Sequence, residues 1–185
     1  VGLPVLLLTQ LHLGAASVGA MYAVMGATGL VATLLAGRVP SERREERFIV
    51  AGCVLAAVGM VIMLIAASAG GGLVVVGVGM AVFGVSQGPY DVGMFSLRQR
   101  VTPAAWMGRA FAVSMSLNFI GMPIGSAIAG PVVEHSLPVA FAVAVLGNVV
   151  AAVAATVMLG RRQYVEAVGS GRRVQSGAQP KQFHD

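Results

Sequence analysis

The sequence predicts an all-α membrane protein, a bundle of six transmembrane helices of which the first is incomplete. Of the 185 residues, 57% are hydrophobic and 10% are charged, whereas a soluble domain carries about 25% charged residues. The mean hydropathy is +0.84. The apolar residues form long runs, and a helix of roughly 20 residues crosses a hydrocarbon core about 30 Å thick. The charged residues fall in short clusters between these runs.

Helices are the expected spanning elements because the runs do not suit the other architecture that crosses membranes. A closed β-barrel shows segments of about ten residues in which apolar and polar side chains alternate. The runs in this chain are about twice that long and do not alternate. The sequence therefore predicts a helical bundle over residues 1–160.

The elements follow in order along the chain. Residues 1–10 are too short to cross a bilayer, and we expect them to be the end of a spanning helix whose beginning is missing. Pro40 and a charged run after it are expected to end the next helix. Residues 161–185 are rich in Gly, Ser, Gln and Arg, so they predict a disordered tail. The complete spans are expected at residues 18–39, 48–67, 73–97, 110–133 and 138–159.

The positive charges predict the orientation of the bundle. When the spans are assigned alternately, all twelve Lys and Arg residues fall on one side, and positive charges mark the cytoplasmic side. The sequence thus predicts a multi-pass protein of the plasma membrane (bacterial inner membrane) with a cytoplasmic C-terminus. The net charge of +5 does not indicate nucleic-acid binding, because no basic helix face is present. The twelve residues are Arg38, Arg43, Arg44, Arg47, Arg98, Arg100, Arg109, Arg161, Arg162, Arg172, Arg173 and Lys181.

Two stripes of small and polar residues lie inside the central spans. The first contains Asp91, and a carboxylate within a membrane costs on the order of 2.5–3.5 kcal/mol, so such a residue usually faces a cavity or a partner. Each stripe contains a Gly-x-x-x-Gly pair that permits close helix packing. One interpretation is that Gln87, Tyr90, Asp91 and Asn118 line a solute or proton path, and the other is that the polar groups only bond between helices. The stripes are Gly84, Gln87, Gly88 and Asp91 in one span, and Ser114, Asn118, Gly121 and Gly125 in the next.

Motifs for enzyme chemistry find no support in this sequence. Residues 84–88 match Gly-x-Ser-x-Gly, but that serine motif needs a strand-turn-helix corner and a nearby histidine. Here it falls within a predicted helix, and no histidine lies within a span. Zinc-binding His-Glu-x-x-His, paired-cysteine and Walker patterns are also lacking. The sequence therefore predicts no enzyme activity, no cofactor and no metal site.

The central loop carries a family resemblance. LRQRVTP at residues 97–103 and GRAF at residues 108–111, with a charged loop after Gly37, resemble the second half of a major facilitator superfamily transporter. The loop is most similar to the drug- and siderophore-exporter branch. On that resemblance, residues 1–10 end the seventh helix and residues 138–159 form the twelfth.

The resemblance implies alternating access, in which two six-helix halves rock around a midplane site. We expect proton-coupled efflux of small molecules, with Asp91 as the protonatable group because it is a buried acid on a polar stripe, and with the missing N-terminal half as a partner. The resemblance also implies a cytoplasmic gate formed by Arg98, Arg100 and Arg109. Glu42 and Arg43 stand one position later than the family's gating motif allows, so a cluster of retention charges is the alternative there. For the chain as a whole, the alternative is a non-transporting truncated module that needs a second half or a second chain.

Overall fold

The computed structural model describes residues 2–39 and 44–177, with side chains through Met158. Every regular element in these ranges is a helix. The elements are α1 (Gly2–Val5), the π-helix η1 (Leu6–Gln10), α2 (Ala15–Ala36), α3 (Glu45–Ala69), α4 (Leu73–Val101), the 3-10 helix η2 (Ala104–Trp106), α5 (Met107–His135) and α6 (Leu137–Gly177).

Five of these helices are long and apolar enough to cross a membrane, judged by their length and composition. They are α2 to α6, which fall on the five complete spans that the sequence predicts. α3, α4 and α5 extend past the apolar runs, because charged residues at a helix end complete its last turns. α2 instead begins and ends three residues before the predicted span of residues 18–39. Glu45 and Glu46, for example, form the first turn of α3, where acidic side chains interact favourably with the helix dipole.

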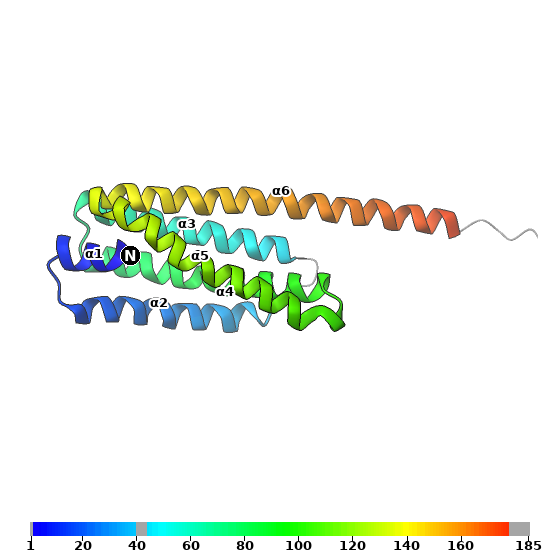
Figure 1. Cartoon of the computed structure of the whole chain (residues 1–185), viewed down its shortest axis with the longest axis horizontal. Coiled ribbons are helices and arrows are strands. Elements are labelled where there is room, and N and C mark those ends of the chain that lie inside the picture. Colours follow the sequence, from blue (N-terminus) through cyan, green and yellow to red (C-terminus); the bar gives the residue numbers. More distant parts are fainter. Residues whose placement is uncertain (1, 40–43, 178–185) are drawn as a thin grey trace, which may run out of the picture.

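The last helix differs from the sequence-based expectation. α6 continues through Gly177, whereas the sequence predicts a disordered tail from residue 161. Figure 1 shows this extension projecting beyond the rest of the bundle. A low apolar content removes core packing but does not prevent helical backbone hydrogen bonds from propagating along the chain. Residues 178–185 of the expected tail lie outside the described residues.

α4 lies at the centre of the packing between α2 and α3, and α3 also packs along α6. Glycines permit the close contact of α3 with α4. A Cβ atom at Gly52 would lie 2.6 Å from Cβ of Tyr90, and one at Gly59 would lie 2.9 Å from the backbone nitrogen of Phe83. Because such distances leave no room for a methyl group, these two glycines set how near the helices approach.

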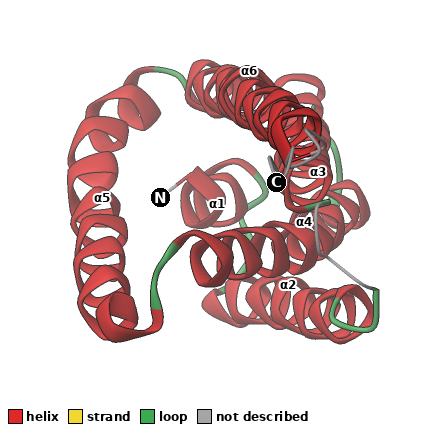
Figure 2. Cartoon of the chain, turned by 90° about the vertical axis from the view of Figure 1, so that its right-hand side faces the viewer, coloured by secondary structure: helices red, strands yellow, loops and turns green. Residues whose placement is uncertain are grey.

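α5 stands apart from the other helices along most of its length. Val133 is its one buried residue, and its main helix partner is α6. In the end-on view of Figure 2, α5 forms one side of a ring that α6, α3 and α4 complete, and α1 lies inside this ring.

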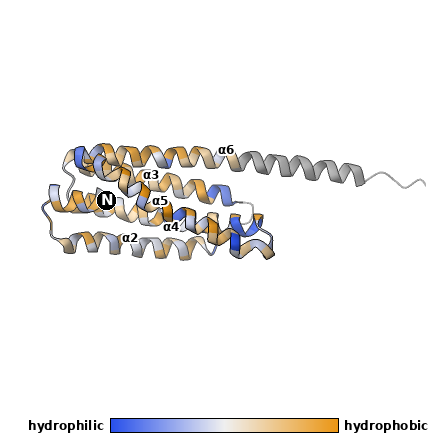
Figure 3. Cartoon of the chain, viewed as in Figure 1, coloured by the Kyte–Doolittle hydropathy of each residue, from blue (hydrophilic) through white to orange (hydrophobic). Residues whose placement is uncertain are grey.

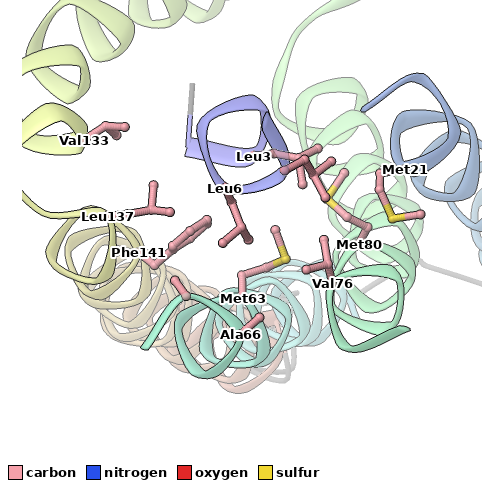
Figure 4. Close-up of a cluster of buried hydrophobic side chains, with 12 residues drawn as sticks. Leu3, Leu6, Met21, Met63, Ala66, Val76, Met80, Val133, Leu137 and Phe141 are labelled. Carbon is pink, nitrogen blue, oxygen red and sulfur yellow. The ribbon is translucent and has the colours of Figure 1, made fainter. Parts of the chain in front are cut away.

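The buried core gathers around α1 and η1 at one end of the molecule. Leu6 and Leu7 are almost fully buried, at 1% and 0% exposure. Figure 4 shows Leu3 and Leu6 directed among side chains of the surrounding long helices. The other members of this cluster are Met21, Met63, Ala66, Ala67, Val76, Met80, Val133, Leu137 and Phe141.

The opposite end of the bundle holds the described arginines, and we call it the arginine-rich end. The end of α2, the start of α3, the end of α4 and the start of α5 meet there, and Figure 3 shows hydrophilic residues gathered on these segments. The arginines whose side chains the structure describes are Arg38, Arg44, Arg47, Arg98, Arg100 and Arg109.

Candidate functional site

A cavity of about 440 Å³ lies inside the helix ring, next to α1. Its walls come from α1 to α6, and they carry no charged side chain. Tyr22 and Ser126 supply the two hydroxyl groups of the lining. The lining residues are Gly2, Leu3, Tyr22, Met25, Met60, Met63, Met80, Phe83, Gly121, Met122, Gly125, Ser126, Ala129, Val133, Ala140, Phe141 and Ala144.

The α4 stripe continues one wall of this cavity toward the arginine-rich end. Met80 and Phe83 line the cavity, and Gln87 follows Phe83 by four residues, so helical spacing puts it on the same face. Asp91 follows Gln87 by another four residues. It therefore lies about 12 Å beyond Phe83 along the helix axis. Gln87 and Asp91 are both half-buried, and neither is among the residues that line the cavity.

Tyr90 lies where α4 packs against α3. Its backbone contacts the position of Gly52 on α3, and its side chain is 38% exposed. Tyr90 follows Gln87 by three residues and Phe83 by seven, so helical spacing puts it beside both, but it is not among the residues that line the cavity.

The glycines of the α4 stripe pack against α2. A Cβ atom at Gly84 would collide with Thr28 and the backbone of Met25, and one at Gly88 would collide with the backbone of Ala32. The sequence suggested a matching stripe on the following helix, and the structure instead brings these glycines to α2. The reason is that Gly29 and Ala32 have small side chains, which let the backbone of α4 approach α2 closely. A Cβ at Gly29 would itself lie 3.2 Å from the carbonyl oxygen of Gly84.

The α5 stripe faces open space. A Cβ atom at Gly121 or Gly125 would have no neighbour within 4 Å, and both glycines line the cavity. Asn118 precedes them by three and seven residues, which puts it on the same face of α5, and it is exposed. Asn118 and Asp91 thus both lie between the cavity and the arginine-rich end, on separate helices.

Aromatic rings hold the arginines of the α4–α5 connection. The guanidinium carbon of Arg98 lies 5.7 Å from the ring centre of Phe95 and 5.9 Å from that of Phe111. The two rings stack with their centres 5.8 Å apart. Because Phe95 belongs to α4 and Phe111 to α5, this cation–π cluster joins the two helices. Arg109 lies 5.2 Å from the ring centre of Trp106.

Arg100 forms an ion pair that the sequence analysis did not single out. Its Nε atom lies 3.0 Å from Oε1 of Glu45, which is buried at the start of α3. The second carboxylate oxygen, Oε2, is also buried and has no hydrogen-bond partner among the residues that the structure describes. The sequence feature that could have pointed to Glu45 is its position as an acid in the first turn of an apolar helix. Glu42 and Arg43, the residues that the sequence did suggest for this gate, lie outside the described residues.

The serine of the Gly-x-Ser-x-Gly match bonds within its own helix. Ser86 is buried within α4, and its hydroxyl donates a hydrogen bond to the carbonyl oxygen of Phe83 at 2.6 Å. Within residues 2–39 and 44–177, no group of three or more His, Cys, Asp or Glu residues is placed to hold a metal ion.

Comparisons with known proteins agree with this architecture. Residues 1–182 match the Major Facilitator Superfamily. The chain is 39% identical over 142 residues to an uncharacterized MFS-type transporter, y4rN, of Sinorhizobium fredii (strain NBRC 101917 / NGR234). The match covers 76% of this chain and 34% of that protein, so the chain spans about a third of the length of this relative. No solved structure matches the chain. With its apolar helices and this match along nearly the whole sequence, the chain belongs to the Major Facilitator Superfamily of membrane transporters.

Proposed function

We propose that this chain is the C-terminal half of a proton-coupled exporter of small, partly apolar molecules, an antiporter that works by alternating access. In this proposal the protein resides in the plasma membrane (bacterial inner membrane), with the arginine-rich end and the C-terminus in the cytoplasm. The arginines support that orientation, because positive charges favour the cytoplasmic side. The similarity of the central loop to drug and siderophore exporters supports the substrate class and the direction of transport.

The position of Asp91 carries the proposal. It is a half-buried acid within an apolar helix, on the face of α4 that continues the cavity wall. Acids at such positions usually serve a function, because keeping a carboxylate inside a membrane is costly. Asp91 is therefore the group that we propose binds and releases the coupled proton. Gln87 and Asn118 would supply uncharged polar groups along the same path.

Tyr90 has weaker support as a pathway residue. Its backbone and Cβ atom pack against Gly52 of α3. We therefore keep Tyr90 in the proposal as a residue that positions α4 against α3.

The arginine-rich end would form the cytoplasmic gate. Arg98 bridges α4 and α5 through two rings, and Arg100 bridges α4 and α3 through Glu45. A gate that opens and closes must change contacts between helices. These two contacts, together with Arg109 at Trp106, are the candidates for that change.

A test replaces Asp91 in the polypeptide that contains both halves. With ethidium as the transported probe, Asp91→Asn should abolish export driven by a pH gradient in proteoliposomes, because the amide cannot take up a proton. Asp91→Glu serves as the matched control and should retain part of the activity. Unchanged pH-driven export by Asp91→Asn, with normal expression, would remove Asp91 from the mechanism.

A second candidate function is supported by the exposed faces of α2 and α5. Both helices present large apolar side chains at their surfaces, including Leu30, Leu34, Leu117 and Phe119. Such faces suit packing against another helical body as well as against lipid. The 185-residue chain would then be a module that transports nothing until a second half or a second chain joins it. Solute flux by the isolated chain in vesicles, combined with a monomeric state in detergent, would rule out this alternative.

A further inference from the structure

A groove of about 470 Å³ runs between α3 and α6, which pack along each other and lie side by side in Figure 2. Met60 and Met63 of α3 line the central cavity, whereas the groove residues of α3 lie on the other side of that helix, as its helical spacing shows. The groove therefore opens away from the interior of the ring. Its lining residues are Cys53, Val54, Ala57, Val58, Val61, Ile62, Val145, Asn148, Val149, Ala152 and Val153.

The lining of the groove suits hydrocarbon. Ala57 and Ala152 are half-buried and small, while the valines beside them on both helices are exposed. None of the lining side chains is charged. The amide nitrogen of Asn148 donates a hydrogen bond to the carbonyl oxygen of Ala144 in its own helix, at 2.9 Å. Because α3 and α6 are both long and apolar enough to cross a membrane, the outer side of this groove faces lipid acyl chains.

An arginine lies in register with the groove. Arg47 precedes Val54 by seven residues and Val58 by eleven, and these offsets put it on the groove side of α3. It is exposed, at the arginine-rich end. The helix rise places Arg47 about 10 Å from Val54 and about 22 Å from Ile62, at the far end of the groove.

The charges around Arg47 leave this side of α3 positive. Arg44 precedes Arg47 by three residues, at the N-cap, and is also exposed. Glu45 is buried on the opposite side of the helix, where it pairs with Arg100. Glu46 lies about 100° around the helix axis from Arg47. Two exposed cations are therefore aligned with the groove, with one acid beside them, and this arrangement favours an anionic partner.

We infer that the groove binds the acyl chain of an anionic phospholipid whose phosphate lies at Arg47. Half of a hydrocarbon core about 30 Å thick is about 15 Å, so the groove spans the depth at which acyl chains from the leaflet of the arginine-rich end terminate. The long side chain of an arginine reaches toward the membrane surface. Its guanidinium group also presents a fork of donors that matches phosphate oxygens. The outer groove is separate from the central cavity, so this inference does not depend on what the protein transports.

The first experiment compares two lipids that share their acyl chains and differ in their headgroups. Dioleoylphosphatidylglycerol is anionic, and dioleoylphosphatidylcholine has no net charge. Added to the polypeptide that contains both halves, in detergent, the first lipid should raise the melting temperature at least about 3 °C more than the second. Arg47→Gln should remove this difference. Arg38→Gln is the matched control, because it removes an exposed arginine at the end of α2, and it should keep the difference.

A second pair of variants tests the acyl chain. Ala152→Leu fills the middle of the groove and should reduce the difference between the two lipids by about half or more. Ala154→Leu is the matched control, because Ala154 is exposed and lies about 160° around α6 from Ala152. It should leave the difference unchanged. Glycerol 3-phosphate, which has the phosphate without an acyl chain, should not raise the melting temperature.

Each other outcome overturns the inference. Equal shifts with the two lipids would show ordinary contact with the bilayer, or a groove covered by another part of the protein or by a second copy. Equal losses in Arg47→Gln and Arg38→Gln would show a general effect of surface charge. An unchanged difference in Ala152→Leu would place the acyl chain elsewhere. Loss of pH-driven export in Asp91→Asn alters none of these results, so the two proposals fail independently.

A measurement on the unsubstituted protein does not depend on how the variants fold. Phosphatidylglycerol that carries a photoreactive diazirine on its acyl chain should form adducts within residues 53–62 and 145–153. An excess of unlabelled phosphatidylglycerol should reduce these adducts at least about three-fold, and the same excess of phosphatidylcholine should reduce them less. Adducts spread evenly over the exposed apolar residues of α2 and α5 would overturn the inference.

Discussion

At the residue scale, Glu45 and Arg100 form the contact with the clearest energetic consequence. Glu45 is buried, and Arg100, at 38% exposure of its side chain, remains partly in water. Solvent screening weakens the attraction of such a pair. A buried carboxylate that loses its partner nevertheless keeps the cost of having been removed from water. The charge of Glu45 therefore depends on Arg100 more than Arg100 depends on Glu45.

We expect Arg100→Gln to lower the free energy of unfolding by about 1–3 kcal/mol, because it leaves the buried carboxylate of Glu45 without its cation. Adding Glu45→Gln should recover part of this loss, since a neutral amide is easier to bury. Chemical unfolding of the four proteins of this double-mutant cycle in detergent measures the coupling. Additive effects of the two changes would show that the pair contributes nothing.

Single residues also mark what the sequence could predict. Asp91 could be found from the sequence, because an acid within a long apolar run stands out without any knowledge of the fold. Glu45 could not be ranked in the same way, because its importance comes from its burial at the start of α3 and from a partner 55 positions later. The aromatic partners of Arg98 were missed for the same reason, since Phe95 and Phe111 come together only when the α4–α5 connection folds back.

At the scale of elements, the existence and type of the long helices followed from run length alone. The partners of each helix did not. A Gly-x-x-x-Gly pair shows that another helix can approach this one closely, but it does not indicate which helix does so. Gly84 and Gly88 therefore meet α2, although an equally good stripe exists on α5. The length of α6 was also missed, because hydropathy detects the apolar span and not the helix that continues beyond it.

The contact between α3 and α4 yields a prediction at this scale. Gly52→Ala should destabilise the bundle by about 1–3 kcal/mol, since the new methyl group would overlap Tyr90 and the surrounding core is closely packed. Gly147→Ala on α6 is the matched control, because a Cβ there meets nothing within 4 Å. The control should be neutral or slightly stabilising. Thermal unfolding of both variants in detergent measures the difference, and equal stabilities would show that the two helices can move apart at little cost.

At the scale of the whole molecule, the segregation of charge determines the proposed orientation. The arginines with described side chains occupy one end of the bundle, as the alternation of spans predicted. This arrangement depends only on the number and order of helices, so the sequence could predict it without tertiary contacts. The cavity could not be predicted, because its walls combine residues from six elements that are up to 142 positions apart.

A labelling experiment tests the orientation. In a Cys53→Ala background, Ala105→Cys should react with a membrane-impermeant maleimide in inside-out vesicles and not in intact cells, because the α4–α5 connection is expected in the cytoplasm. His12→Cys, on the connection at the opposite end of the bundle, should show the reverse pattern. Labelling of Ala105→Cys from the outside of intact cells would invert the proposed topology and exclude a cytoplasmic gate at Arg98.

The way α5 is held has a mechanical consequence. Near one end of this helix, Phe111 contacts Arg98 of α4. Near the other end, Val133 is buried beside α6, so the tertiary contacts of α5 lie at its two ends. The middle of α5 can therefore bend without breaking the contacts at either end. Pro123 and Pro131 remove backbone hydrogen bonds within α5. They therefore make the helix easier to bend toward its Val133 end. A force on the centre of α5 would therefore tilt both ends of the helix together. Bending at the centre would change the contact between Phe111 and the guanidinium group of Arg98.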